Sequence, residues 1–206
     1  MDFRFNEKQE KYMEKVKAAA KTLAEKVIFD ETKVEDYRIM LKEMANANVF
    51  EPLRSLEPDE LGLSFPIVIA RETFSRYFPF GDFIFAEQAL AIIPILMWGT
   101  EEQKEKYIEP LLRGELIGGL ALTEEKSGSD ASSLSCKAEK NESGDYVLNG
   151  KKVWISNACF ADVLIVFART GEHRTKGVSA FIIESPREGL TTVPVELSAP
   201  HPIGEL

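Results

Sequence analysis

Residues 121–133 read A-L-T-E-E-K-S-G-S-D-A-S-S, and K-V-W-I-S-N follows at residues 152–157. The first stretch predicts a strand that ends in a hydroxyl, an acid and a loop of small residues. The second predicts a neighbouring strand that carries an indole and another hydroxyl. Small residues let a backbone approach a flat, phosphate-bearing ligand closely. Together the two stretches favour a flavin site over a metal site or a simple nucleotide site.

The first stretch predicts particular contacts to such a ligand. Thr123 ends the predicted strand, where its hydroxyl can hydrogen-bond a ring nitrogen or carbonyl of a flat cofactor. Ser127, Gly128 and Ser129 offer small side chains and backbone N–H groups, which suit a pyrophosphate. The alternative is a polar loop whose Ser and Asp residues form only Ser and Asx turns.

The second stretch also has two interpretations. Trp154 and Ser156 fall on one face of the predicted strand, because side chains alternate along a strand. An indole beside a hydroxyl suits the edge of a flavin ring. A strand tryptophan is more often a core residue whose indole N–H is satisfied. Spacing alone leaves both interpretations open.

Composition excludes several classes of protein. The chain has 206 residues, 44% of them hydrophobic, so it can bury one or two cores. The net charge of -9 argues against nucleic acid as a partner, because phosphate binding requires a basic surface. No apolar segment follows Met1, so no signal peptide is expected, and the apolar segment 89–98 is too short to span a bilayer. Cys136 and Cys159 lack metal-site spacing and are expected to be free thiols. The default expectation is a soluble protein of the cytoplasm or an organelle matrix, without a metal.

The first half of the sequence predicts helices. Apolar residues recur at helical spacing over 7–27, 34–47, 67–78, 83–97 and 101–112. Asn6 is expected to cap the first helix, and Thr100 is expected to form a capping box with Gln103 at the fifth. Pro79 and Gly81 are expected to break the chain between the third helix and the fourth.

After residue 114 the apolar period changes to two. Runs rich in β-branched and aromatic residues predict strands at 117–122, 135–139, 146–148, 151–155, 163–167 and 178–183. Asn149-Gly150, between two of them, predicts a type I′ hairpin. The sequence therefore predicts an α+β protein with a helical domain at 1–114 and a β domain at 115–206.

Several motifs, taken in order, resemble the acyl-CoA dehydrogenase family. They are G-T-E-E-Q-K at 99–104, the stretch 121–133, Y-V-L-N-G-K-K-V-W-I-S-N at 146–157 and K-G-V-S-A-F-I-I-E at 176–184. The resemblance covers about 99–189, and the preceding helices fit the family's N-terminal domain in layout. It implies an all-helical N-terminal domain, then an antiparallel, barrel-like or sandwich-like β middle domain, incomplete here at its C-terminal end. A C-terminal helical domain is expected beyond Leu206.

The resemblance also implies an activity, FAD-dependent α,β-dehydrogenation of an acyl-CoA thioester. In the family a glutamate takes the α proton, the β hydrogen leaves as hydride to the flavin, and electron-transferring flavoprotein usually reoxidises the flavin. The expected partners are acyl-CoA or an acyl carrier and electron-transferring flavoprotein, with neither nucleic acid nor a membrane span. The catalytic glutamate is expected in the C-terminal domain, so no catalytic residue is assigned. The full-length protein is expected to be a homo-oligomer.

Seven residues resemble the family's cofactor contacts: Leu120, Leu122, Thr123, Gly128, Ser129, Trp154 and Ser156. The first three match contacts to the flavin ring, and the glycine–serine pair matches the pyrophosphate loop. Ser129 is also expected near the pantetheine of the substrate. The last two match a Trp-Ile-Thr landmark that packs against the ring, with Ser156 in place of threonine. Glu124 is expected to cap N–H groups of the loop rather than to act as a base.

Two departures from the family pattern stand out: the first is expected to make the loop more mobile, and the second bears on substrate choice. Glu125-Lys126-Ser127 stands where the family usually has Pro-Gly-Ala, and the segment 48–63 lacks a Gly-Gly-rich stretch. Because that segment borders the acyl pocket in the family, an unusual substrate is expected. The alternatives are a related flavin monooxygenase, an acyl-carrier-protein dehydrogenase, or a truncated, non-catalytic interaction protein.

Overall fold

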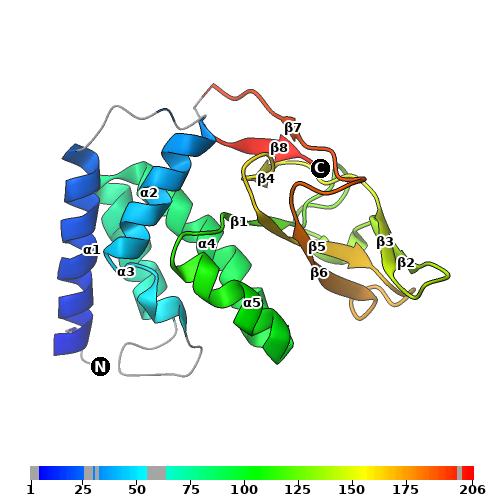
Figure 1. Cartoon of the computed structure of the whole chain (residues 1–206), viewed down its shortest axis with the longest axis horizontal. Coiled ribbons are helices and arrows are strands. Elements are labelled where there is room, and N and C mark those ends of the chain that lie inside the picture. Colours follow the sequence, from blue (N-terminus) through cyan, green and yellow to red (C-terminus); the bar gives the residue numbers. More distant parts are fainter. Residues whose placement is uncertain (1–4, 26–29, 31–32, 55–63, 199–200) are drawn as a thin grey trace. The chain divides into compact units, whose positions relative to one another are not determined.

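The chain folds into two units, Met1–Leu116 and Ile117–Leu206. The computed structural model describes residues 5–25, 30, 33–54, 64–198 and 201–206. Helices make up the first unit and strands the second (Figure 1). Most of the predicted departure at 48–63, and the predicted end of the first helix at 26–27, lie outside the described residues.

Side-chain caps decide where two helices of the first unit begin. Its helices are α1 (Glu7–Glu25), α2 (Val34–Asn46), the short 3-10 helix η1 (Glu51–Arg54), α3 (Phe65–Tyr77), α4 (Pro79–Trp98) and α5 (Glu101–Leu112). Asn6 Oδ1 accepts a hydrogen bond from Gln9 N at 2.9 Å, and Gln9 Oε1 accepts one from Asn6 N at 3.0 Å. Thr100 and Gln103 form the same reciprocal box at α5. Both predicted caps are confirmed, because each satisfies N–H groups that the first helical turn leaves without partners.

The predicted break between the third helix and the fourth is present, because α3 ends at Tyr77, but α4 begins at Pro79 rather than at residue 83, so Pro79 and Gly81 both lie in its first turn. Proline suits this position because the N–H that it lacks has no partner there and its φ is already helical. Gly81 is needed for packing: a Cβ added there would come within 2.4 Å of Phe74 and 2.8 Å of Phe78. The break therefore lies at Phe78, and the two residues that were expected to form it start the next helix.

Helix α4 is longer than the apolar segment 89–98. Its 20 residues are long and apolar enough to cross a membrane, yet 56% of the most apolar window is buried inside the protein. A helix that is apolar on every side is also typical of a protein core. Length and composition therefore give only weak support for a membrane span.

Short strands form two sheets in the second unit. They are β1 (Gly118–Ala121), β2 (Lys137–Lys140), β3 (Tyr146–Asn149), β4 (Ile155–Ser156), β5 (Val163–Arg169), β6 (Val178–Glu184), β7 (Val193–Pro194) and β8 (Ile203–Glu205). The larger sheet has the order β1-β5-β2-β3, with β6 also paired to β5, and the smaller has the order β4-β8-β7. A short 3-10 helix, η2 (Ala131–Ser133), precedes β2.

The larger sheet is mixed, so the expectation of an antiparallel barrel or sandwich is corrected. Strand β5 runs parallel to β1 and to β2, whereas β2–β3 and β5–β6 are antiparallel. Parallel neighbours need a long crossover connection. The chain between β1 and β5, which contains β2, β3 and β4, supplies it. The coarser prediction, a helical domain followed by a β domain, agrees with the structure.

The predicted hairpin at Asn149-Gly150 is also wrong. Strand β3 pairs with β2 around a turn at 141–145, and β4 pairs with β8. Gly150 is required for a different reason: a Cβ there would lie 2.6–2.7 Å from the Cα, Cβ and Sγ atoms of Cys136. The glycine thus permits a close approach of two chain segments rather than a turn.

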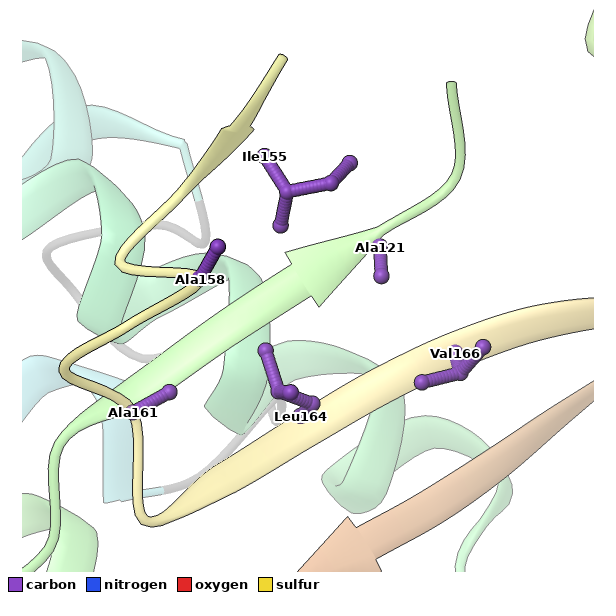
Figure 2. Packing of buried hydrophobic residues seen from close by; sticks show 6 residues of the cluster. All are labelled: Ala121, Ile155, Ala158, Ala161, Leu164 and Val166. Atoms are coloured by element: carbon purple, nitrogen blue, oxygen red, sulfur yellow. The ribbon is translucent and has the colours of Figure 1, made fainter. Parts of the chain in front are cut away.

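Small residues bring the elements of the β unit together. One core cluster consists of Ala121, Ile155, Ala158, Ala161, Leu164 and Val166. Figure 2 shows these side chains coming from β1, from β4, from the turn after β4, and from β5. Three of the six are alanines, so the backbones of β1 and of the segment after β4 approach closely. Both cysteines are free, as expected: Cys136 is buried and Cys159 is exposed.

Replacing Gly150 with alanine should lower the free energy of unfolding by about 1–3 kcal/mol, because the new methyl group overpacks the contact with Cys136. Urea unfolding monitored by circular dichroism measures the change. The matched control is Gly128→Ala, since a Cβ at Gly128 meets no atom within 4 Å in the described part of the chain. Equal stability of the two variants would rule out the proposed close contact.

Candidate functional site

A tight turn follows β1 and begins the first quoted stretch. Glu124 N donates to Ser127 O at 2.9 Å, and Ser127 N donates to Glu124 O at 3.1 Å. Glu125 and Lys126, at the tip, are exposed. The turn needs no Pro-Gly pair, because the two backbone hydrogen bonds close it.

Glu124 is a buried carboxylate with four donors. Its oxygens accept from Ser135 N at 2.6 Å, Ser135 Oγ at 2.7 Å, Cys136 N at 2.9 Å and Lys152 Nζ at 2.8 Å. Burial alone raises the pKa of Glu124, but the hydrogen bonds from Lys152, Ser135 and Cys136 outweigh burial and lower the pKa to about 2. The expectation that Glu124 caps N–H groups of the loop is confirmed.

The serines that follow the turn support the alternative interpretation in part. Ser127 Oγ and Ser133 Oγ each donate to Asp130 O at 2.9 Å, and Ser132 Oγ donates to Asp130 Oδ1 at 2.6 Å. Hydrogen bonds from Ser132 and Arg174 lower the pKa of Asp130. These are the local Ser and Asx turns that the alternative predicted.

The expected group of free N–H donors is smaller than predicted. Ser127 N is used by the turn. Within the described part of the chain, Gly128 N and Ser129 N make no hydrogen bond, and both residues are exposed. Two adjacent backbone donors therefore remain available to an anion.

Trp154 has an unusual conformation for a bulky residue. Its φ is 59°, and its side chain is 60% exposed, whereas Val153 and Ile155 on either side are buried. A bulky residue at positive φ costs of order 1–3 kcal/mol and persists only where its surroundings enforce it. The interpretation of Trp154 as a core residue is therefore wrong.

The strand that was expected to carry Trp154 is also shorter than predicted. Strand β4 covers only Ile155–Ser156, so the alternation argument that placed Trp154 and Ser156 on one face does not apply. The left-handed φ of Trp154 interrupts the extended backbone before β4. Similarly, β1 ends at Ala121, so Thr123 lies beyond the strand that was expected to include it.

The two quoted stretches nevertheless lie side by side. Val153 N donates to Thr123 O at 3.0 Å, and Lys152 Nζ donates to Leu122 O at 3.0 Å. The hydroxyl of Thr123 has no hydrogen-bond partner among the described residues. Leu122, which is half-buried, is thus the chain neighbour of an available hydroxyl. Trp154, whose indole is exposed, directly follows the residue that pairs with Thr123.

Over the ranges that the structure describes, the other predicted site residues lie near the paired segments of Thr123 and Val153 but make no hydrogen bond with Trp154 or the Thr123 hydroxyl. Leu120 is half-buried in β1, and Ser156 is half-buried in β4. A Cβ added at Gly119 would lie 3.3 Å from Ser156 O, so β1 and β4 are adjacent. Gly128 and Ser129 join this group through the Glu124–Ser127 turn.

Two residues of the site were missed by the sequence analysis. Lys152 is only 2% exposed and joins both stretches. Arg169 Nε donates to Leu134 O at 3.0 Å and Arg169 Nη2 donates to Ser132 O at 2.7 Å, which ties η2 to the end of β5. Lys152 follows Lys151 directly, and no local signal in the sequence distinguishes the buried lysine from the exposed one.

Within the described residues, neither of two other kinds of candidate site, a metal site and a polar hollow, offers an unpaired cation or a group of metal ligands. No group of three or more His, Cys, Asp or Glu residues is placed there to hold a metal. A polar hollow of about 340 Å³ in the helical unit is lined by Lys42 and Arg54, among others. Arg54 pairs with Glu51 and Glu109, and Lys42 donates to Arg113 O. The cations of this hollow are therefore already occupied.

Comparison with known proteins identifies the frame that holds this site. Residues 6–115 match the family profile "Acyl-CoA dehydrogenase, N-terminal domain", and residues 119–203 match "Acyl-CoA dehydrogenase, middle domain". The chain belongs to the acyl-CoA dehydrogenase family.

Individual relatives agree with this assignment. The structure of butyryl-CoA dehydrogenase from Megasphaera elsdenii superposes with a TM-score of 0.79 at 30% identity, covering 100% of this chain and 56% of that one. An acyl-CoA dehydrogenase complexed with FAD from Bacillus anthracis superposes with a TM-score of 0.77 at 29% identity, covering 98% and 35%. An L-prolyl-(peptidyl-carrier protein) dehydrogenase of a Serratia species is 44% identical over 106 residues, 51% of this chain and 27% of the relative. The chain thus spans little more than half the length of butyryl-CoA dehydrogenase.

Proposed function

We propose that the chain forms the FAD-binding and substrate-binding part of an enzyme that dehydrogenates the α,β bond of an acyl-CoA thioester. FAD, when bound, supplies the two-electron oxidation. The residues of this chain bind and orient cofactor and substrate. The proposal includes a helical domain at 1–114, a β domain at 115–206, and a catalytic base outside this chain.

The observation that carries the proposal is the conformation of Trp154. Trp154 has an exposed indole and φ 59°, and it follows Val153, whose N–H binds Thr123 O in a segment with a half-buried leucine and an available hydroxyl. Residues with a strained backbone conformation cluster at active sites and ligand sites, where the strain helps to hold a side chain ready for its ligand. A flat, partly polar ring such as isoalloxazine fits this set of an indole, an apolar side chain and a hydroxyl.

Each proposed cofactor residue has a chemical role in this assignment. Leu120 and Leu122 give apolar contact to the ring, the hydroxyls of Thr123 and Ser156 hydrogen-bond its polar edge, and Trp154 flanks it. The available N–H groups of Gly128 and Ser129 bind the pyrophosphate. Ser129 also contacts the pantetheine of the substrate. Arg174, which pairs with Asp130, offsets the negative charge nearest to these amides.

Electron-transferring flavoprotein is the proposed electron acceptor, and a homo-oligomer in the cytoplasm or an organelle matrix is the proposed setting. A second function is favoured by one relative, the Serratia L-prolyl-(peptidyl-carrier protein) dehydrogenase. In that case the acyl group is carried by a protein rather than by free CoA. Competition of acyl-CoA and acyl-pantetheine-loaded carrier for the FAD-loaded protein separates the two functions.

Equilibrium dialysis against FAD tests the proposed cofactor directly. Saturable binding of one FAD per chain is expected, with flavin bands near about 370 and 450 nm that change shape in the bound fraction. The control is Trp98→Ala, which removes an exposed side chain of the helical unit and none of the proposed contacts. Uptake that rises linearly with FAD concentration would reject the proposed site.

Replacing Thr123 with valine should shift the flavin's two-electron potential by about 20 mV, because one hydrogen bond of about 1 kcal/mol to the ring is lost. Spectroelectrochemical titration of the FAD-loaded protein measures the shift. Thr123→Ser is the matched control, since it keeps the hydroxyl. A valine variant with the potential of the serine variant would remove Thr123 from the ring contacts.

A further inference from the structure

Lys152 binds the segment after β1 at two points. Its ammonium donates to Leu122 O at 3.0 Å and to Glu124 Oε1 at 2.8 Å, so it holds the residues on both sides of Thr123. Its own backbone is fixed as well, because Lys152 N donates to Leu206 O and Leu206 N donates to Lys152 O. The side chain is therefore a crosslink between a fixed backbone and the segment that carries Thr123.

The other half of this crosslink extends to the start of the β2–β3 hairpin. Glu124 accepts from the backbone N–H groups of Ser135 and Cys136 while it pairs with Lys152. Side-chain exposure of the pair is 2% for the lysine and 6% for the glutamate. A buried ion pair usually contributes no more stability than apolar residues of the same volume. Its hydrogen bonds to three segments point to a role in fixing one arrangement of them.

Trp154 requires such an arrangement. It lies two residues after Lys152, its φ is 59°, and its neighbour Val153 donates to Thr123 O. On its other side Ile155 pairs with Gly204 of β8. The strained residue is therefore held between β4 and the crosslink made by Lys152.

We propose that Lys152 is a positioning residue for FAD, which keeps Trp154 and Thr123 in the arrangement that the flavin ring requires. This inference rests on the proposed function. Lys152 does not contact the cofactor itself, because its ammonium is buried and directed at a carbonyl and a carboxylate of the protein. Because Lys152 holds Trp154 and Thr123 in place before FAD binds, binding of FAD does not have to order these two residues.

The test compares Lys152→Met with Lys151→Met. Lys151 is the adjacent lysine, half exposed, and pairs with Glu125 and Glu205 at the surface. Both variants are made in a Trp98→Phe background, so that Trp154 is the only tryptophan. Lys152→Met should weaken FAD binding by about tenfold in equilibrium dialysis and abolish the tryptophan near-ultraviolet circular dichroism of the FAD-free chain. Lys151→Met should change neither.

The near-ultraviolet circular dichroism of the FAD-free chain distinguishes failure of the role proposed for Lys152 from failure of the proposed function. If the unsubstituted chain binds no FAD, the proposed function fails, and the dichroism of Trp154 still tests the role of Lys152. Lys152→Met with normal dichroism and normal FAD affinity overturns the inference.

If Lys152→Met does not fold, a second variant keeps the inference testable. Lys152→Met combined with Glu124→Gln removes both charges of the ion pair, while the amide oxygen can still accept from Ser135 or Cys136, and should recover part of the lost stability. Loss of the Trp154 signal in this folded double variant supports positioning, and a retained signal contradicts it. Lys152→Arg keeps the charge and should recover part of the FAD affinity of Lys152→Met, whereas no recovery counts against the inference.

Discussion

Replacing Glu124 with alanine is expected to lower the free energy of unfolding by about 3–5 kcal/mol, the largest stability change among the substitutions considered. The variant leaves the ammonium of Lys152, 2% exposed, without its carboxylate. It also leaves the N–H groups of Ser135 and Cys136 without an acceptor. Urea unfolding at pH 7 measures the loss.

The neighbouring residue provides the control. Glu125 is 69% exposed and its pair with Lys151 is long, at 3.4 Å, so Glu125→Ala should change stability by less than about 0.5 kcal/mol. A loss below about 1 kcal/mol for Glu124→Ala would show that the buried pair is not part of the folded structure.

The same pair makes a prediction about pH. The pKa of Glu124 is about 2 in the folded chain and 4.5 ordinarily, so the unfolded chain takes up the proton first as pH falls. The stabilisation is complete above about pH 4.5 and is lost as pH falls toward 2. Its size is about 3 kcal/mol, from about 1.4 kcal/mol per pKa unit. The stability difference between wild type and Glu124→Gln, measured across this range, should shrink accordingly, because other carboxylates cancel in the difference.

Replacing Trp154 with alanine should weaken FAD binding by about 10- to 100-fold, because stacking of an aromatic side chain on a heterocycle contributes roughly 1–3 kcal/mol. Trp154→Phe keeps a ring and should lose much less. Trp98→Ala is the control for removal of an exposed tryptophan, since Trp98 is 74% exposed in the helical unit. Equilibrium dialysis gives the affinities.

Trp154→Gly adds a sharper test, because relative to Trp154→Ala the stability should rise while the affinity for FAD stays unchanged. Glycine accepts φ near 59° without strain, so this variant should be more stable than Trp154→Ala by about 1 kcal/mol while binding FAD equally poorly. A glycine variant that binds FAD as tightly as wild type would contradict a stacking role for the indole.

Local sequence signals predicted the helices well. Asn6 and Thr100 cap the helices that they were expected to cap, because a cap depends on residues only three positions apart. The break between α3 and α4 was predicted, but the start of α4 was placed four residues late, since proline and glycine also occur inside helices where the first turn or a neighbouring Phe74 requires them. Sequence alone does not distinguish these uses.

The β unit was harder to predict because its contacts join distant segments. Gly150 was interpreted as a turn, but its function is contact with Cys136, fourteen positions earlier. The left-handed φ of Trp154 and the buried charge of Lys152 also depend on partners elsewhere in the fold. The residue types of the two stretches indicated a polar and aromatic site, while the way in which the stretches are held together became visible only in three dimensions.

A titration of FAD into the Trp98→Phe chain, followed by the fluorescence of Trp154, tests the flavin site most directly. Stacking of the ring on the indole predicts quenching that saturates at one FAD per chain and that is weaker at every sub-saturating concentration in Lys152→Met. FAD that binds by dialysis while the emission of Trp154 changes only in proportion to added chromophore would contradict the assignment of this surface to the flavin.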